Sequence, residues 1–212
     1  MNAMSGWPAQ EAEFYGETLQ LLAAAEAAII ERVDRIRQAE VERMGRDPVE
    51  HVKARIKKAK SMREKLVRRG FAPTAEAALN CVHDAVGVRI VCSFLEDVYR
   101  MANRMQAQEN WSVVCVKDYI RKPKRNGYRS YHLIIQLDMP YDGGRGLVYG
   151  EVQLRTLAMD TWASLEHEMK YKRTLPNQAM IVDELRRCAD EIASTDLSLQ
   201  TLRDLMNGSL ER

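Results

Sequence analysis

Residues 117–137 read KDYIRKPKRNGYRSYHLIIQL, a basic stretch that runs directly into an apolar one. Its first part, Lys117–Arg129, holds six lysines and arginines against one acid, a local charge of +5 in a chain whose formal net charge is +2. The proline, asparagine and glycine inside it favour a loop over a helix. Tyr128 ends this part, where a strand pattern begins. A basic loop that ends in an aromatic ring suits a phosphorylated ligand with a flat base, and a merely solvated loop is the alternative.

A second basic stretch lies earlier in the chain. Residues 53–69, KARIKKAKSMREKLVRR, carry nine basic residues and one acid. Positive charge concentrated in two separate stretches predicts one anion pocket with two walls. A nucleic-acid surface would show a similar pattern and is the rival interpretation.

Residue patterns around these stretches predict interleaved helices and strands in the first half of the chain. Val52, Ala54 and Ile56 alternate with basic residues, which is typical of a strand with one basic face. The run VGVRIVCS at 86–93 has the composition of a buried strand. Capping boxes predict two helix starts, Ser61 with Glu64 and Ser93 with Glu96. The helices expected here cover about residues 9–45, 61–70, 74–83 and 93–108.

The second half is expected to form three strands and then helices. The strands are expected over about 111–120, 128–139 and 147–156, and the last two are joined by a turn over Asp142–Gly146. One helix is expected over about 158–172, and at least one more follows it. Helices and strands therefore interleave, which predicts an α/β or α+β domain with a mixed sheet of about five strands and a helix at each end.

The composition limits the classes of protein that fit. A chain of 212 residues with 29% charged and 46% hydrophobic residues is typical of one globular domain. No apolar run is long enough to span a bilayer and no signal peptide is evident, so a cytoplasmic protein is expected. The cysteines lack metal-site spacing and are expected to be buried thiols: Cys81, Cys92, Cys115 and Cys188.

Two carboxylates stand out at positions where burial is costly. Asp84 precedes the strand at 86–93, and Glu151 lies within the strand at 147–156. Hard oxygen ligands of this kind suit Mg²⁺ at a phosphate-handling site. Alternation puts Glu151, Gln153 and Arg155 on one strand face, which predicts a polar cleft. The alternatives are a cap or surface charge for Asp84 and an exposed sheet face for Glu151.

Other residues carry weaker signals. Arg89 is the lone basic residue of a buried strand and is expected to point out of the core, toward whatever Asp84 faces. His132 is either a buried core histidine or a ligand donor, and His83 and His167 are expected to be structural. No P-loop or dinucleotide-binding glycine motif occurs, so anions must be held by lysine, arginine and a metal. Three residues at helical spacing on the segment at 158–172 are expected in the core: Trp162, Leu165 and Tyr171.

Four motifs in unbroken order carry a resemblance to a known family. They are Arg55-Ile-Lys57 followed by Ser61 and Lys65, then HDAVGVRIVCSF at 83–94, KPKRNGYRSYH at 122–132, and EVQLRT with the helix that follows it at 151–172. The chain resembles the synthetase domain of the RelA/SpoT family, in particular the single-domain small alarmone synthetases of the RelQ type. The match implies one domain over 1–212, with a core at about 50–172 and helical extensions at 1–49 and 173–212. It also implies a fold similar to the nucleotidyltransferases.

The resemblance implies a reaction, its cofactor and its catalytic residues. Such enzymes move the β,γ-pyrophosphate of ATP to the ribose 3′-OH of GTP or GDP, and so make pppGpp or ppGpp together with AMP. Asp84 matches the Mg²⁺ ligand of the family, and Glu151 matches the carboxylate that contacts the metal and activates the 3′-OH. A degenerate synthetase that binds alarmone or RNA, or a related nucleotidyltransferase, is the alternative.

The same resemblance implies which residues bind the two nucleotides. Arg55 and Arg89 match the arginines on either side of the adenine. Asp160 stands where some relatives carry Asn, and it either accepts hydrogen bonds from the guanine or caps or pairs on its helix. The residues that match the ATP phosphate contacts are Lys57, Ser61 and Lys65. The acceptor nucleotide contacts are the stacking ring Tyr128 together with Lys117, Lys124, His132 and Gln153.

The terminal helices predict self-association. The motifs end near Lys172, so the chemistry is not expected to need the residues that follow. Apolar stripes run along both ends of the chain, at Leu22, Ile29, Val33 and Ile36 and at Ile181, Leu185, Cys188, Ile192, Leu199, Leu202 and Met206. Leftover stripes usually become interfaces, so a homo-oligomer is expected, and the resemblance points to a tetramer. One stripe that packs on the domain's own sheet is the alternative.

Overall fold

The structure, a computed structural model, describes residues 7–141, 144–171 and 178–210. Its strands are β1 (Val49–Ile56), β2 (Val86–Cys92), β3 (Ser112–Asp118), β4 (Tyr131–Tyr141) and β5 (Gly144–Thr156). Its helices are α1 (Ala9–Tyr15), α2 (Thr18–Met44), α3 (Ala59–Arg68), α4 (Ala75–Asn80), α5 (Leu95–Gln106), α6 (Leu157–Tyr171) and α7 (Gln178–Leu210). A basic loop, residues 119–130, joins β3 to β4.

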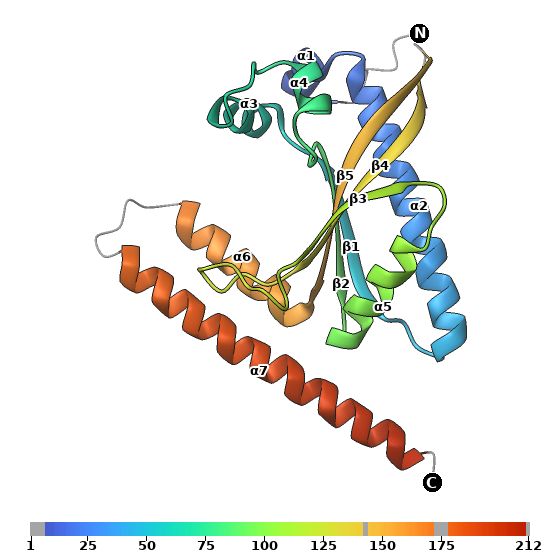
Figure 1. Cartoon of the computed structure of the whole chain (residues 1–212), viewed down its shortest axis with the longest axis vertical. Coiled ribbons are helices and arrows are strands. Elements are labelled where there is room, and N and C mark those ends of the chain that lie inside the picture. Colours follow the sequence, from blue (N-terminus) through green and yellow to red (C-terminus); the bar gives the residue numbers. More distant parts are fainter. Residues whose placement is uncertain (1–6, 142–143, 172–177, 211–212) are drawn as a thin grey trace.

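The strands form one mixed sheet in the order β1-β2-β5-β4-β3 (Figure 1). β2 and β5 run parallel, and the other neighbouring pairs are antiparallel. The five-stranded mixed sheet predicted from the sequence is therefore confirmed, including the meander of the last three strands. The expected turn between β4 and β5 includes Asp142 and Gly143, which lie outside the described residues, as does Lys172 at the expected end of the core.

Helices α2 and α5 cover one face of the sheet and form the main core with it (Figure 1). The N-terminal apolar stripe faces this core: Leu22, Ile29 and Val33 are fully buried, and Ile36 is 6% exposed. A Cβ on Gly150 of β5 would lie 2.7 Å from Ile29 Cδ1, so the helix crosses the strand where no side chain intervenes. Each large side chain buried in this way stabilises the fold by about 1.5–3 kcal/mol. This stripe therefore packs on the domain's own sheet, the alternative that the sequence left open.

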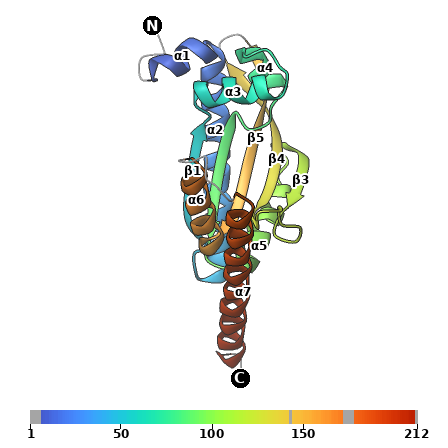
Figure 2. The ribbon, with the colours of Figure 1, turned by 90° about the vertical axis from the view of Figure 1, so that its left-hand side faces the viewer.

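The second face of the sheet is covered only at its two ends. Helices α1, α3 and α4 lie at one end, and α6 and α7 lie at the other (Figures 1 and 2). At the first end, the Tyr15 hydroxyl donates to the carbonyl of Lys57 at 2.6 Å, and the Ala59 amide donates to Glu11 at 3.4 Å. These contacts from α1 fix the turn between β1 and α3. The middle of the face is left open for polar side chains.

Both predicted capping boxes are wrong, although the helices themselves form. Helix α3 begins at Ala59 and α5 at Leu95, and neither has a side-chain cap. Ser93 instead donates to Glu50 at 2.7 Å. Leu165 is also not in the core, since it is 54% exposed, whereas Trp162 is buried as predicted. The side chain of Tyr171 lies outside the described residues.

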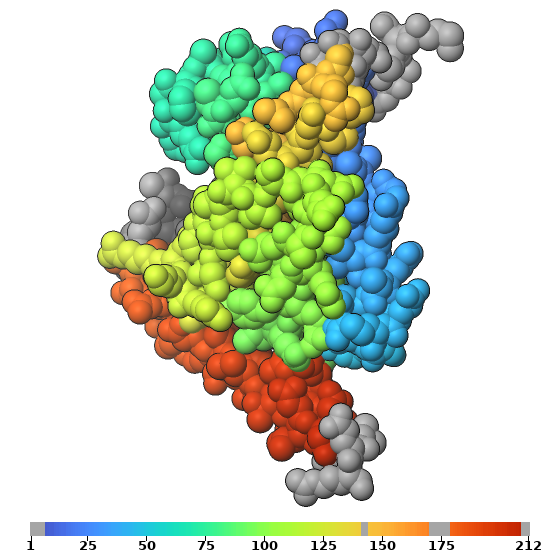
Figure 3. Space-filling view, turned by 45° about the vertical axis from the view of Figure 1, so that its right-hand side comes forward, coloured from blue at the N-terminus to red at the C-terminus, as the bar shows by residue number. Residues whose placement is uncertain are grey.

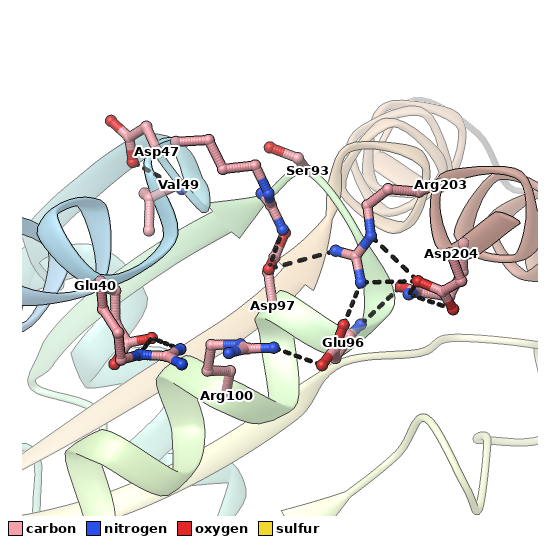
Figure 4. A network of polar contacts seen from close by, with 12 residues as sticks. Glu40, Asp47, Val49, Ser93, Glu96, Asp97, Arg100, Arg203 and Asp204 are labelled. Atoms are coloured by element: carbon pink, nitrogen blue, oxygen red, sulfur yellow. Dashed lines mark hydrogen bonds and ion pairs between the residues drawn. The ribbon is translucent and has the colours of Figure 1, made fainter. Parts of the chain in front are cut away.

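Helix α7 is one continuous helix of 33 residues, and its far half extends beyond the body of the domain (Figures 1 and 2). Arg203 of α7 pairs with Glu96 and lies 3.6 Å from Asp97, both on α5 (Figure 4). Asp97 is fully buried and also pairs with Arg46 at 2.7 Å, so two arginines compensate for the burial of its charge. Among the described residues no helix is both long enough and apolar enough to cross a membrane.

Candidate active site

A row of polar residues crosses the open face of the sheet from edge to edge. Strand pairing brings Lys53 beside Arg89, Arg89 beside Gln153, Gln153 beside His132, and His132 beside Lys117. Side chains of paired residues point to the same side of a sheet, so each strand contributes one member of the row. A second row on the same face, two residues away along each strand, contains Arg55, Gly87 and Glu151. Because alternate residues of each strand point to the same face, these polar side chains gather there and form the site.

A first cavity of about 380 Å³ lies over β1, β2 and β5. Basic residues dominate its polar lining, and a glycine forms part of its floor. A Cβ on Gly87 would have only Arg55 atoms near it, at 3.9 and 4.0 Å, so the strand leaves an open space here. The lining residues are Lys53, Ala54, Arg55, Lys57, Asp84, Gly87, Val88, Arg89, Glu151 and Gln153.

Asp84 is held at one end of this cavity by two lysines. Lys57 Nζ lies 3.1 Å and Lys65 Nζ 2.5 Å from Asp84 Oδ2. The other carboxylate oxygen, Oδ1, is buried and has no hydrogen-bond partner. A buried carboxylate oxygen without a partner is costly, which indicates a site for a cation.

A second cavity of about 660 Å³ lies beside the first, under the basic loop. It shares Glu151 and Gln153 with the first cavity, so these two side chains form the wall between them. Its other lining residues come from β4, the basic loop and the last two helices. They are Lys124, Arg125, Asn126, Tyr128, His132, Glu166 and Val182.

A closed ring of hydrogen bonds joins the shared wall to the aromatic ring of the loop. Arg155 Nη2 donates to the Tyr128 hydroxyl at 2.6 Å and to Gln153 at 2.9 Å, and Gln153 donates to Glu151 at 2.8 Å. His132 lies 3.2 Å from Glu151 through Nδ1 and 2.9 Å from the Tyr128 hydroxyl through Nε2. Because a carboxylate can only accept, Nδ1 of His132 carries the proton, and Nε2 of the neutral ring accepts from Tyr128. The ring fixes the orientation of all five side chains.

The charge states in the site follow from burial and from these partners. Burial alone raises the pKa of Glu151. The hydrogen bond from His132, the charge that His132 carries when protonated, and the hydrogen bond from Gln153 outweigh it and lower the pKa to about 2. Burial lowers the pKa of His132 and the pKa of Lys124. Glu151 is therefore ionised and His132 neutral at pH 7.

The residues present fit a bound Mg²⁺. Asp84 and Glu151 line the same cavity, and Asp84 Oδ1 has no partner. Among the described residues, no group of three or more His, Cys, Asp or Glu side chains could hold a metal on its own. Two carboxylates are enough for Mg²⁺, which usually takes its remaining ligands from water and substrate phosphates.

The structure brings most of the predicted site residues together but not all of them. Asp84, Lys57, Lys65 and the residues that line the two cavities meet at the open face, as the motifs indicate. Ser61 is exposed on the first turn of α3, and Lys117 is exposed at the end of β3; neither residue is among those that line the two cavities described above. Asp160 is not among the residues that line the two cavities, and Arg89 and Arg155 each donate to its Oδ1 at 3.1 Å. This arrangement matches the helix-pairing alternative for Asp160.

Several residues of the site were not assigned a role from the sequence, and three of them show why. Gly87 forms part of the cavity floor, and a glycine inside an apolar strand is a signal of close approach that could have identified it. Arg155 was placed on the polar face, but its contacts with Tyr128 and Asp160 could not be read from spacing. Val182 reaches the second cavity from α7, and no sequence signal indicated this.

Known proteins are similar to this chain in sequence and in fold. The family model for the region found in RelA/SpoT proteins matches residues 54–175. GTP pyrophosphokinase YwaC of Bacillus subtilis is 43% identical over 146 residues, 69% of this chain and 70% of that protein. The crystal structure of small alarmone synthetase 2 from B. subtilis is 38% identical with a TM-score of 0.76, over 88% of this chain and 97% of that one. Small alarmone synthetase 1 bound to its product pppGpp is 28% identical with a TM-score of 0.80, over 89% and 96% of the two chains.

Proposed function

The chain belongs to the RelA/SpoT family, and from this premise we propose how its two cavities carry out pyrophosphate transfer. Its relatives are named GTP pyrophosphokinases and alarmone synthetases, and the chain is a GTP diphosphokinase that synthesises (p)ppGpp. A degenerate binding protein and a nucleotidyltransferase, the alternatives left open by the sequence, are not favoured. Structural relatives bound to pppGpp and to AMPCPP support nucleotide substrates for this chain.

In this proposal the first cavity binds ATP and the second binds GTP or GDP. The observation that carries it is the shared wall: Glu151 and Gln153 line both cavities, so a group bound in one can reach the other past them. Arg55 and Arg89 would flank the adenine, because a guanidinium stacks well on a flat base. Tyr128, which ends the basic loop, would stack on the guanine in the second cavity.

The transfer needs little covalent chemistry from the protein. The 3′-oxygen of the acceptor attacks the β-phosphorus of ATP, the bond from that phosphorus to the α,β-bridging oxygen breaks, and AMP leaves with that oxygen. The 3′-OH donates a hydrogen bond to the ionised carboxylate of Glu151, and this carboxylate takes up the proton as the new oxygen–phosphorus bond forms. Because the pKa of Glu151 is about 2 before substrates bind, we assign it mainly to orienting the hydroxyl and holding the metal.

Positive charge on both sides of the wall offsets the repulsion between two polyphosphates. Lys57 and Lys65 neutralise Asp84 in the structure, and we propose that they turn to the ATP phosphates when Asp84 takes a metal. Burial lowers the pKa of Lys65, so an arriving phosphate also stabilises its charged form. Asp84 and Glu151 would hold the divalent ion typical of the family, here Mg²⁺, which supplies charge stabilisation on the transferred group.

We further propose that the protein is a homo-oligomer, and specifically a tetramer, assembled through α7. The C-terminal apolar stripe divides into two parts. Leu185 is buried, and Ile181, Cys188 and Ile192 pack on the same cluster within the domain. The rest of the stripe and its neighbours are 49–69% exposed on the projecting half of the helix: Leu197, Leu199, Leu202, Leu205 and Met206. An apolar face of this kind, next to a polar surface, is typical of an interface.

The test of the catalytic assignment is Glu151→Gln. The variant keeps nearly the same volume but loses the charge, so synthesis should fall by roughly 10²–10⁴-fold while the affinities for an ATP analogue and for GDP stay within about threefold of wild type. Turnover is measured as AMP release, and affinities by titration calorimetry. Glu109→Gln, an exposed residue outside both cavities, is the matched control and should behave as wild type. Near-wild-type turnover in Glu151→Gln would remove Glu151 from the mechanism.

A further inference from the structure

Helix α7 begins at Gln178, after the end of the family match at residue 175, yet it contacts the basic loop directly. Figure 3 shows the loop, in yellow-green, lying against α7, in orange and red. The first contact between the basic loop and α7 is made by Gly127. This residue has φ +88°, and a Cβ placed on it would lie 2.6 Å from Ala189 Cβ and 3.0 Å from Arg186 Cα. The loop backbone therefore rests on the surface of α7 so closely that no side chain fits between them.

Arg129 ties the end of the loop to the same turn of α7. Its Nη1 donates to the Ala189 carbonyl at 3.3 Å, and its Nη2 donates to Asp190 at 2.9 Å. Nη1 also donates to the Gly127 carbonyl at 3.2 Å, so one guanidinium bridges the loop turn and the helix. The Arg129 side chain is only 17% exposed, which limits the alternative positions it can take.

The residue between these two contacts is Tyr128. Its ring packs against the small apolar cluster formed by Trp162 of α6 and by Leu185 and Ala189 of α7. Val182 of α7 lines the second cavity itself. Helix α7 therefore contacts the Tyr128 ring and also the loop residues on either side of it, Gly127 and Arg129.

The helix is itself held in position on the domain. Trp162 Nε1 donates to the Leu185 carbonyl at 2.9 Å, and Thr156 donates to the buried Asp196 at 2.6 Å. Arg203 pairs with Glu96 of α5 near the other end (Figure 4). A support that is anchored at three positions along its length can fix the loop that lies on it.

We propose that α7 is a positioning element of the acceptor site, and that Ala189 and Asp190 hold the basic loop so that Tyr128 presents its ring to the guanine. The inference rests on the proposed function, which assigns the second cavity to the acceptor nucleotide. It assigns a role to residues that lie outside the family match. From the sequence, the reaction was not expected to need these residues. No described residue of α7 lines the first cavity, so we expect this contact to act on acceptor binding and not directly on ATP binding.

The experiment compares two variants of α7 with a neighbouring control. Asp190→Ala removes the partner of Arg129, and Ala189→Leu pushes a larger side chain toward Gly127. Asp190→Ala should raise the KM for GDP about three- to fivefold, the range of a partly exposed ion pair, and Asp190→Glu should restore it. Ala189→Leu should raise it by about tenfold or more, because the loop backbone must move. The KM for ATP should stay at the wild-type value in all of them.

Glu191→Ala is the matched control, since it removes the adjacent acid, whose partner is Arg187 of the same helix. It should leave both KM values unchanged. Melting temperature and mass by light scattering are recorded for each variant, so that a loss of folding or assembly is recognised. Equal rises in the two KM values, or an unchanged KM for GDP in both Asp190→Ala and Ala189→Leu, would overturn the proposal.

A direct binding titration separates this inference from the proposed function. A fluorescent GDP analogue is titrated into each protein in the absence of ATP, so that no turnover is required. Weaker binding by Ala189→Leu supports the positioning role, and wild-type binding contradicts it. A wild-type protein that makes no product would refute the proposed function, and the titration alone would then decide the role of α7.

Discussion

At the scale of single residues, the absence of a side chain at Gly87 shapes the first cavity, which we propose binds ATP. Gly87 lies between Arg55 of β1 and Glu151 of β5 in the second polar row. Its φ is not positive, and a Cβ would meet its nearest neighbours at 3.9 and 4.0 Å, an ordinary contact distance. The fold therefore does not require glycine here, and the space above it is available to the nucleotide.

Gly87→Val should narrow the ATP cavity without harming the fold. A side chain that overlaps the bound nucleotide is expected to cost about 1–3 kcal/mol, as overpacking does, which corresponds to a rise of about five- to 150-fold in the KM for ATP. Gly87→Ala should give a smaller rise, and the KM for GDP should not change in either variant. Steady-state kinetics with each substrate varied in turn checks this, with melting temperature as the control for folding. Parallel rises in both KM values would contradict the assignment of the first cavity to ATP.

Most residues of the site could be predicted because they lie in short, ordered motifs on strands. Alternation along a strand gives the face of Glu151 and Gln153 directly. Residue spacing along the sequence could not predict contacts between elements that meet only after folding. The ion pairs of Asp160 with Arg89 and Arg155 depend on where α6 lies on the sheet, and the unpartnered Asp84 Oδ1 depends on where α3 brings Lys65.

At the scale of elements, α7 carries a buried acid, Asp196, whose negative charge costs stability in the folded protein. Asp196 accepts a hydrogen bond from Thr156, but burial raises its pKa above the ordinary value. A carboxyl whose pKa is higher in the folded state than in the unfolded chain binds more protons when folded. Its ionisation therefore costs stability as the pH rises through the raised pKa.

Asp196→Asn should stabilise the protein at neutral pH. The amide oxygen can still accept from Thr156, and no charge is buried, so the melting temperature should rise by about 2–4 °C for each kcal/mol gained. The difference from wild type should shrink as the pH falls toward 4, because wild-type Asp196 then takes up a proton. Thermal melts between pH 4 and 8 test this, with the exposed Asp183→Asn as the control. A difference that does not vary with pH would contradict this explanation.

The elements themselves were largely predictable, and their ends were not. Strong periodicity and β-branched composition located the strands and helices within a few residues. The Ser93–Glu96 box failed because Ser93 pairs with Glu50 and Glu96 pairs with Arg100 and Arg203, contacts that replace local capping. The Ser61–Glu64 box failed because α3 begins at Ala59, so Ser61 already lies inside the helix. The long apolar pattern after residue 180 indicated a helix. It could not show that the apolar residues pack on the domain only in the first half, while Asp196 and Arg203 hold the second half through polar contacts.

At the scale of the whole molecule, the projecting half of α7 leads us to predict assembly. Light scattering at micromolar concentration should give a mass near four times the 24.3 kDa of the chain. Leu202→Glu, in the middle of the exposed apolar face, should lower that mass because it places a charge in the interface. Val67→Glu on α3, a residue that is 62% exposed, is the control and should leave the mass unchanged. A monomeric wild-type protein would show that the face is not an interface.

The cytoplasmic location stays a prediction.

The central claim is that pyrophosphate moves from ATP in one cavity to a guanine nucleotide in the other across Glu151. Product analysis with γ-labelled ATP, unlabelled GDP and Mg²⁺ tests it most directly. We predict that the label appears in a guanosine nucleotide with a 3′-diphosphate, in amounts equal to the unlabelled AMP that forms. Label recovered as free pyrophosphate or phosphate, with no labelled guanosine product, would contradict the account.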